Sequence, residues 1–213
     1  MKMSRQSEQI LEEQLLIQLQ KLGYQYVSIA DEKDLLANLQ VQLEKHNQAA
    51  LAKTGNSKFS KTEFERVLNL LNKGSVFEKS KTLRQKQHII RDAPEGAATG
   101  ENLYFEFLNT EHWCQNQYQV THQVSQAGTY KNRYDVTILI NGMPLVQIEL
   151  KRKGLELKEA FNQINRYQRH SFGANTALFQ YVQIFIISNG VNTKYYSNNR
   201  QQSFKQTFYW TDI

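Results

Sequence analysis

The chain has 213 residues, of which 40% are hydrophobic, 11% aromatic and 22% charged, and its formal net charge is +6. This composition is that of one large globular domain with a good core, and it excludes a disordered or fibrous chain. No apolar run approaches the length of a membrane span, and the amino-terminal segment lacks the apolar core of a signal peptide. The single cysteine, Cys114, excludes an internal disulfide framework and fits a reducing cytoplasm.

The positive charge is unevenly spread along the chain. Residues 79–91 carry basic side chains and no acidic one, and basic residues outnumber acidic ones across 131–170. Such clusters are expected where the phosphates of a nucleic acid approach, but they are also typical of a solvated basic face. Charge alone leaves both interpretations open.

The first half of the chain predicts helices more than strands. A helix is expected over 7–22, with Ser7 as its cap and Gly23 as its end, because leucines recur there at helical spacing. The further elements expected are a short strand over 24–29, helices over 31–51 and 61–72, and strands over 87–91, 102–108 and 119–124.

The second half predicts a β-hairpin followed by a crossover helix. An apolar run over 136–140, the turn signal Asn141-Gly142 and a second strand over 144–150 make the hairpin. A helix over 155–168 then leads to the apolar run 181–188, which is typical of a strand buried on both faces. These elements predict an α/β fold in which the helix crosses a mixed sheet and delivers 181–188 beside the hairpin. The last elements expected are a strand over 193–197 and core aromatic residues at Tyr195, Tyr196, Phe208, Tyr209 and Trp210.

Three charged residues of the hairpin are expected to converge. Glu149 and Lys151 are two apart in one strand and therefore point the same way. A loop of two to four residues places Asp135 opposite position 148, 149 or 150 of that strand. Two carboxylates and an ammonium group within reach of one another suit a divalent metal site that cuts phosphodiesters, in which Lys151 positions water or stabilises developing negative charge. The alternative is an exposed cross-strand salt bridge, and spacing alone does not decide between the two.

The segment YDVTILINGMPLVQIELKRKG, followed by EAFNQINRY, resembles the PD-(D/E)xK nuclease core in the amino-terminal region of type I restriction enzyme motor subunits. The resemblance puts the catalytic aspartate, glutamate and lysine of that family on Asp135, Glu149 and Lys151, with the two acids as metal ligands. Tyr134 stands where the superfamily has its proline. The fold implied is a restriction-endonuclease-like mixed central β-sheet flanked by helices.

The same resemblance implies further site residues outside the hairpin. The glutamine-x-x-x-tyrosine motif of the family falls on Gln163 and Tyr167, four apart on one helix face. The opening helix of the family brings acidic residues to the metal, and Glu8 and Glu12 are the matching positions, with Glu12 preferred. The sequence also suggests phosphate contacts at Arg152, Lys153, Arg166 and Arg169, for which a solvated surface is an equal alternative.

The function implied by the resemblance is Mg²⁺-dependent, non-specific cleavage of double-stranded DNA, after ATP-driven translocation by the rest of the subunit. Methylation and specificity subunits are the implied partners. The chain contains no P-loop motif, so ATP is expected to act only through motor domains outside it. We therefore expect a single nuclease domain over 1–213, with a catalytic core at about 100–190, that looks excised from a longer protein. A catalytically silent DNA-binding or docking module is the alternative from a different class.

Overall fold

The computed structural model describes residues 4–126, 132–170, 178–199 and 201–210. Its helices are α1 (Ser4–Lys21), α2 (Glu32–His46), α3 (Gln48–Lys53), α4 (Lys61–Leu71), α5 (Val76–Arg84) and α6 (Leu157–His170). Its strands are β1 (Gln25–Tyr26), β2 (Gln87–Ile90), β3 (Asn102–Phe105), β4 (Tyr118–Gln126), β5 (Asn132–Ile140), β6 (Met143–Leu150), β7 (Ile184–Ser188), β8 (Thr193–Ser197) and β9 (Phe208–Tyr209). Short 3₁₀ turns are η1 (Trp113–Gln115), η2 (Leu178–Tyr181) and η3 (Phe204–Gln206).

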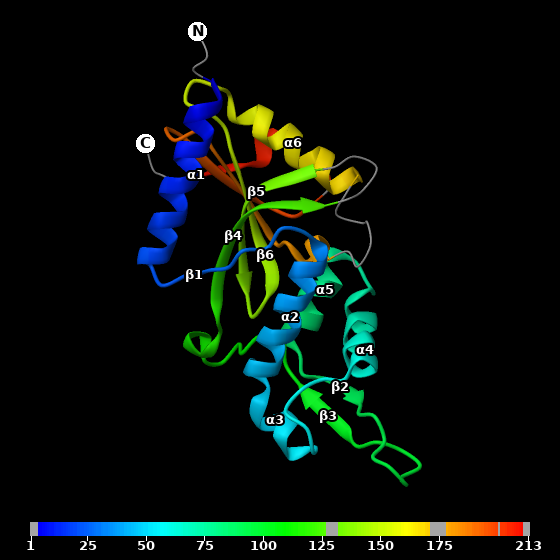
Figure 1. Cartoon of the computed structure of the whole chain (residues 1–213). Helices are drawn as coiled ribbons and strands as arrows, with labels where there is room; N and C mark the ends of the chain where they lie inside the picture. Colours follow the sequence, from blue (N-terminus) through cyan, green and yellow to red (C-terminus); the bar gives the residue numbers. More distant parts are fainter. Residues whose placement is uncertain (1–3, 127–131, 171–177, 200, 211–213) are drawn as a thin grey trace.

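Seven strands form one mixed sheet in the order β1-β4-β5-β6-β7-β8-β9. Figure 1 shows strands β4, β5 and β6 between the helices α1 and α6. The β1/β4 and β6/β7 pairs are parallel, and the other neighbours are antiparallel. Helix α6 joins β6 to its parallel neighbour β7, so the predicted crossover and the predicted α/β class with helices flanking a mixed sheet are both confirmed. Strands β2 and β3 form a separate antiparallel pair.

The sheet separates two apolar cores. The smaller core lies under α1, where Leu16 and Leu19 pack on Val120, Val136 and other residues of β4, β5 and β6. The larger core lies on the opposite face and contains apolar residues of α2, α4 and α6 together with η2. Because α1 and α6 cover opposite faces, side chains of the central strands are buried whichever way they point.

The hairpin turn has the geometry that its sequence predicts. Asn141 and Gly142 both have positive φ, 49° and 81°, as a two-residue type I′ turn requires. Space matters there too, since a Cβ on Gly142 would lie 2.7 Å from the Cα of Leu39 in α2. The turn is therefore fitted closely against the helix.

Several element bounds differ from those predicted. The first helix begins at Ser4, ahead of its predicted cap at Ser7, and the helix expected over 31–51 is broken at Asn47 into α2 and α3. The buried Asn47 side chain is the reason for the break, because it bonds the backbone of Leu43 and of Glu106, a residue beyond β3.

Helix α5 was not among the predicted elements, although Ser75 and Glu78 form a capping box at its start. Its Lys79 is buried, donates 2.6 Å to the Leu71 carbonyl and stands 4.7 Å from the centre of the Tyr181 ring.

The carboxyl-terminal elements correct two expectations. The run over 181–188 contributes only Ile184–Ser188 to the sheet. Phe185 and Ile187 are buried in the larger core and Ile186 packs against the smaller core, whereas Ile184 is 42% exposed. Of the five aromatic residues expected in the core, only Tyr196 is buried. The other four lie at the β8–β9 margin of the sheet, where no further strand covers them among the described residues; they are Tyr195, Phe208, Tyr209 and Trp210.

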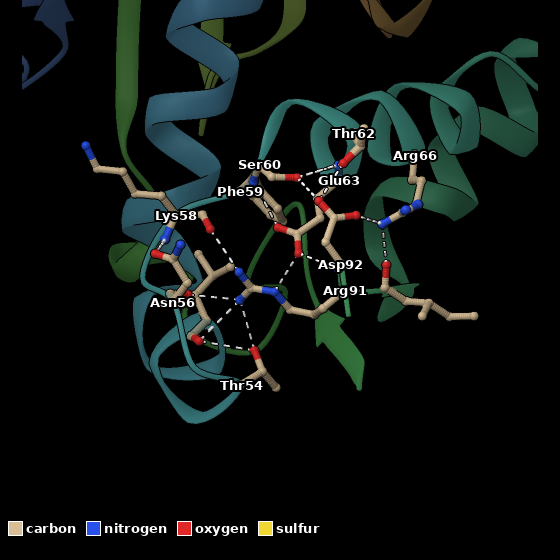
Figure 2. Close-up of polar contacts among 12 residues, drawn as sticks. Thr54, Asn56, Lys58, Phe59, Ser60, Thr62, Glu63, Arg66, Arg91 and Asp92 are labelled. Atoms are coloured by element: carbon tan, nitrogen blue, oxygen red, sulfur yellow. Dashed lines mark hydrogen bonds and ion pairs between the residues drawn. The ribbon is translucent and has the colours of Figure 1, made fainter. Parts of the chain in front are cut away.

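A buried ion pair joins Arg91, the residue that follows β2, to Glu63 of α4 (Figure 2). The Arg91 guanidinium donates 2.9 Å to Glu63 of α4 and also bonds Thr54 and the backbone oxygens of Asn56 and Lys58. Arg91 and Glu63 are 6% and 2% exposed, so the pair is removed from water but fully hydrogen-bonded. Arg91 therefore anchors the loop between α3 and α4, together with Glu44 of α2, which accepts a hydrogen bond from the Phe59 amide.

Candidate nuclease site

The candidate site lies where β5 and β6 run side by side. Thr137 pairs with Gln147 and Val136 with Ile148, and continuing this register places Asp135 opposite Glu149. The sequence left positions 148, 149 and 150 open as the partner of Asp135, and the structure has position 149. The Asp135 carboxyl group accepts a hydrogen bond of 2.9 Å from the Leu150 amide, which fixes it against β6.

Glu149 and Lys151 form a close ion pair on the same strand. The Lys151 ammonium lies 3.0 Å from Oε1 of Glu149 and also donates to the Leu150 carbonyl at 3.1 Å. The Glu149 side chain has no solvent exposure and that of Lys151 has 12%, so the exposed salt bridge considered from spacing does not describe this pair. A buried pair of this kind is strong only if its remaining polar atoms are satisfied.

The two carboxyl groups shift each other's titration. Burial raises the pKa of Glu149 well above its ordinary value, the neighbouring Asp135 raises it further, and Lys151 opposes both. Burial also raises the pKa of Asp135, while the Leu150 amide and Lys151 lower it. Such a site disfavours two ionised carboxylates together, so either one of the acids stays protonated or a bound cation offsets the two negative charges.

The donor set fits a magnesium ion. Oε2 of Glu149 is buried and has no hydrogen-bond partner in the described part of the chain, so a carboxylate oxygen is available inside the site. The described residues hold no cluster of three or more His, Cys, Asp or Glu side chains arranged for a metal. Mg²⁺ does not need one, because it keeps several waters and is commonly held by one or two carboxylates with substrate phosphate.

Helix α6 contributes Gln163 and Tyr167 behind the two strands. The Tyr167 hydroxyl donates 3.0 Å to the Arg133 carbonyl and accepts a hydrogen bond from the Gln163 amide. Burial raises the pKa of Tyr167, so its hydroxyl stays protonated and remains a donor. Its ring meets Tyr134, the residue at the superfamily's proline position, at 4.9 Å between centroids. The motif thus contacts the backbone of β5 two residues before Asp135.

Helix α1 brings both candidate acids to the site from the other face. Glu8 accepts a 3.0 Å bond from the Arg152 amide, and Glu12 accepts a short hydrogen bond from Gln123 of β4. Burial raises the pKa of Glu12 to about 7, the Gln123 bond lowers it and the nearby Asp135 raises it. Both glutamates line a cleft of about 620 Å³ together with Asp135, Arg133 and His122.

The four basic candidates divide into two groups. Arg166 and Arg169 are exposed on α6 and line a hollow with Lys151 and Gln163, so they lie beside the candidate site. Lys153 lines a different hollow, next to Lys194 and Tyr209, and Arg152 is half-buried and contacts Glu8 through its backbone. The structure therefore brings the α6 arginines, but not Lys153, into the same hollow as Lys151.

Two residues of β4 at this site were missed from the sequence. Gln123 bonds Glu12, and Nε2 of His122 lies 3.8 Å from the same carboxyl group. Residues 119–124 were predicted only as a strand, and regular alternation would have turned one of these two neighbours away. No pattern in the sequence signals that both face α1.

The mixed sheet, with helices on both faces and an acid pair beside a lysine on adjacent strands, is that of the restriction-endonuclease-like class of α/β domains. A family described as the type I restriction enzyme R protein N terminus matches residues 5–204. The chain belongs to this family, as its resemblance predicts.

Two bacterial relatives support the same placement. The chain is 46% identical, over 99% of its length, to the type I restriction enzyme SauCOLORF180P endonuclease subunit of Staphylococcus aureus (strain COL), of which it covers 21%. It is 39% identical, over 97% of its length, to the EcoprrI endonuclease subunit of Escherichia coli, of which it covers 64%. The chain therefore spans about a fifth of the length of the staphylococcal relative. Within the described ranges, no helix has the length and apolar character that crossing a bilayer requires.

Proposed function

We propose that this chain is a Mg²⁺-dependent endonuclease domain that hydrolyses DNA phosphodiesters within a type I restriction enzyme. The observation that supports this most is Glu149, a carboxyl group without solvent exposure that pairs with Lys151, faces Asp135 and keeps one oxygen unpartnered among the described residues. A module that only binds DNA gains nothing from buried paired carboxylates, because they repel phosphate.

Asp135 and Glu149 would hold the metal, with Glu12 near it from α1. A bound Mg²⁺ supplies Lewis-acid stabilisation of the phosphoryl oxygens and lowers the pKa of a bound water. Lys151 stabilises negative charge at the reacting phosphate or orients the attacking water, since its ammonium group is already held beside the acid pair. Gln163 and Tyr167 hold the β5 backbone that carries Asp135.

The family and the names of the relatives support a role within a larger assembly. We propose double-stranded DNA as the substrate and methylation and specificity subunits as the partners, in a cytoplasmic complex. Sequence recognition belongs to the specificity subunit, and cleavage follows ATP-driven translocation by motor domains outside these residues. Arg166 and Arg169 line one hollow with Lys151, which supports contacts with DNA phosphates there; Arg152 and Lys153 are further candidates for such contacts.

The proposal is tested by substituting the three site residues in the assembled enzyme. Asp135→Asn, Glu149→Gln and Lys151→Met change charge with little change in size, and each is expected to abolish double-strand cleavage while ATP hydrolysis continues. Glu156→Gln, which changes an exposed glutamate, should cut at the normal rate. Full cleavage by any of the three variants would contradict the site. If all three variants matched the wild type, the chain would be a silent DNA-binding or docking module.

A further inference from the structure

Gln123 has a backbone conformation that a strand residue rarely adopts. Its φ is 57°, in the left-handed region, although it lies inside β4 and is not a glycine. The other described non-glycine residue with positive φ is Asn141, which needs it for the hairpin turn. A glutamine in this region is strained, and such strain persists only where the surroundings hold it in place.

Two neighbouring strands change faces at this point. Val120 packs in the smaller core and Val124 in the larger, although residues four apart in a regular strand share a face. On β5, Val136 belongs to the smaller core and Tyr134 to the larger. His122 pairs with Val136 and Val124 with Tyr134, so the face change occurs at Gln123 on one strand and at Asp135 on the other.

The face change directs two successive side chains of β4 toward α1. His122 lies 3.8 Å from one oxygen of Glu12, and the Gln123 amide donates to the other. All three residues line the cleft that contains Asp135. In regular alternation, Gln123 would point toward the opposite core and could not reach α1.

We propose that Gln123 is a positioning residue: its left-handed backbone turns its amide toward α1, where it holds the Glu12 carboxyl group in the cleft beside Asp135. This inference rests on the proposed nuclease function and adds to it a residue that acts through Glu12.

The polar atoms around Glu12 argue against a purely structural role. Oε1 of Gln123 and Nδ1 of His122 are buried and have no hydrogen-bond partner in the ranges that the structure describes. A distortion that served only packing would be expected to satisfy such atoms internally, because an unpaired buried group destabilises the fold. Both unpaired atoms belong to the two side chains that contact Glu12, so the polar groups of this cluster are not satisfied by the described residues alone.

The test separates the backbone strain of Gln123 from its hydrogen bond, in the full-length subunit assembled into its complex. Gln123→Gly removes both, since glycine adopts positive φ freely. We expect its thermal unfolding midpoint to equal that of the wild type or to exceed it by about 2–4 °C. Its cleavage rate should fall about 10-fold or more, and the Mg²⁺ concentration for half-maximal cleavage should rise. Gln123→Ala keeps the strain, so it should lose cleavage without gaining stability.

Gln119 provides a matched control on the same strand. It is a buried glutamine that bonds Asn38 of α2 on the opposite face. Gln119→Ala should lower the unfolding midpoint and leave the cleavage rate and its Mg²⁺ dependence unchanged. Asp135→Asn is measured alongside: if it abolishes cleavage while both Gln123 variants cut like the wild type, the positioning role is wrong and the proposed function stands. If Asp135→Asn also cuts normally, the proposed function itself fails.

Discussion

At the scale of single residues, the buried Glu149 side chain dominates the electrostatics of the candidate site. A carboxyl group with no solvent exposure is costly to ionise, and here Lys151 at 3.0 Å offsets part of that cost. Asp135 on the neighbouring strand makes the ionisation of Glu149 still less favourable. The two acids are held together by the sheet, which is why their repulsion is tolerated and why a cation would bind between neighbouring strands.

Tyr167 provides a test of the α6 residues that lie behind Asp135 and Glu149. Tyr167→Phe keeps the ring contact with Tyr134 but removes the hydroxyl that joins Gln163 to the Arg133 carbonyl. We expect the free energy of unfolding to fall by about 1 kcal/mol, because a part-buried carbonyl loses its donor. Cleavage by the assembled enzyme should fall, since β5 carries Asp135. Gln163→Ala should reduce cleavage as well, and normal cutting by both variants would make α6 purely structural.

The sequence predicted some of these residues for clear reasons. The alternation of β6 places Glu149 and Lys151 on one side, and the Asn-Gly turn limits the position opposite Asp135 to 148, 149 or 150. The choice of 149 depends on an irregularity between Ile138 and Leu139 that shifts the register by one residue, which local rules do not reveal. Glu12, Gln163 and Tyr167 came from family resemblance. Gln123 could not be found, because the left-handed conformation of a glutamine depends on tertiary contacts and not on its own preference.

At the scale of elements, one arginine holds the loop between α3 and α4. Arg91→Met removes one partner of the buried pair with Glu63 and leaves several backbone oxygens without a donor (Figure 2). Breaking such a pair costs about 3–5 kcal/mol of unfolding free energy, to be measured by urea denaturation. Arg66→Met is the matched control, since its salt bridge with Asp92 is exposed and contributes about 0–1 kcal/mol. Equal losses in the two variants would contradict the special role of Arg91.

The same region predicts a pH dependence of stability. Hydrogen bonds from Ser60 and Thr62, with Arg66 nearby, lower the pKa of Asp92 from 3.8 to about 2. Because the folded state favours the ionised Asp92 carboxylate, Asp92 adds to the free energy of unfolding above pH 4. This stabilisation is lost as the pH falls toward 2. Asp92→Asn should therefore be less stable than the wild type at pH 6, and the difference should shrink at pH 3 in urea titrations. A difference that grew on acidification would reverse the sign of the shift.

Element bounds were less predictable than element types. The break between α2 and α3 depends on Asn47 bonding the distant Glu106 backbone, which local helical periodicity cannot reveal. Helix α5 had a usable signal in its Ser75–Glu78 capping box, but its nine residues include only three apolar ones, which is a short segment for reading a helical pattern. The exposure of Phe208 and Trp210 depends on their place at a sheet margin, which is a property of the whole topology.

At the scale of the whole molecule, the crossover through α6 was predictable because a hairpin, a helix and an apolar strand in that order leave few topologies. The expectation of one nuclease domain over the entire chain stays a prediction. So does its dependence on a motor, which gives a direct experiment. The isolated 213-residue chain with Mg²⁺ should cleave plasmid DNA no faster than its own Asp135→Asn variant, and it should not hydrolyse ATP. Robust cleavage by the isolated wild-type chain would show that cleavage does not depend on other domains.

Both margins of the seven-stranded sheet are strands of two residues, β1 and β9. An open sheet edge offers unpaired amides and carbonyls on which another chain can add a strand, and long flat edges lead to aggregation. Here each edge strand is two residues long, so it has few backbone groups of its own to offer to a further strand. The long, apolar strands β5 and β6, which carry the acids, are paired on both sides and are thus kept away from edge-to-edge pairing.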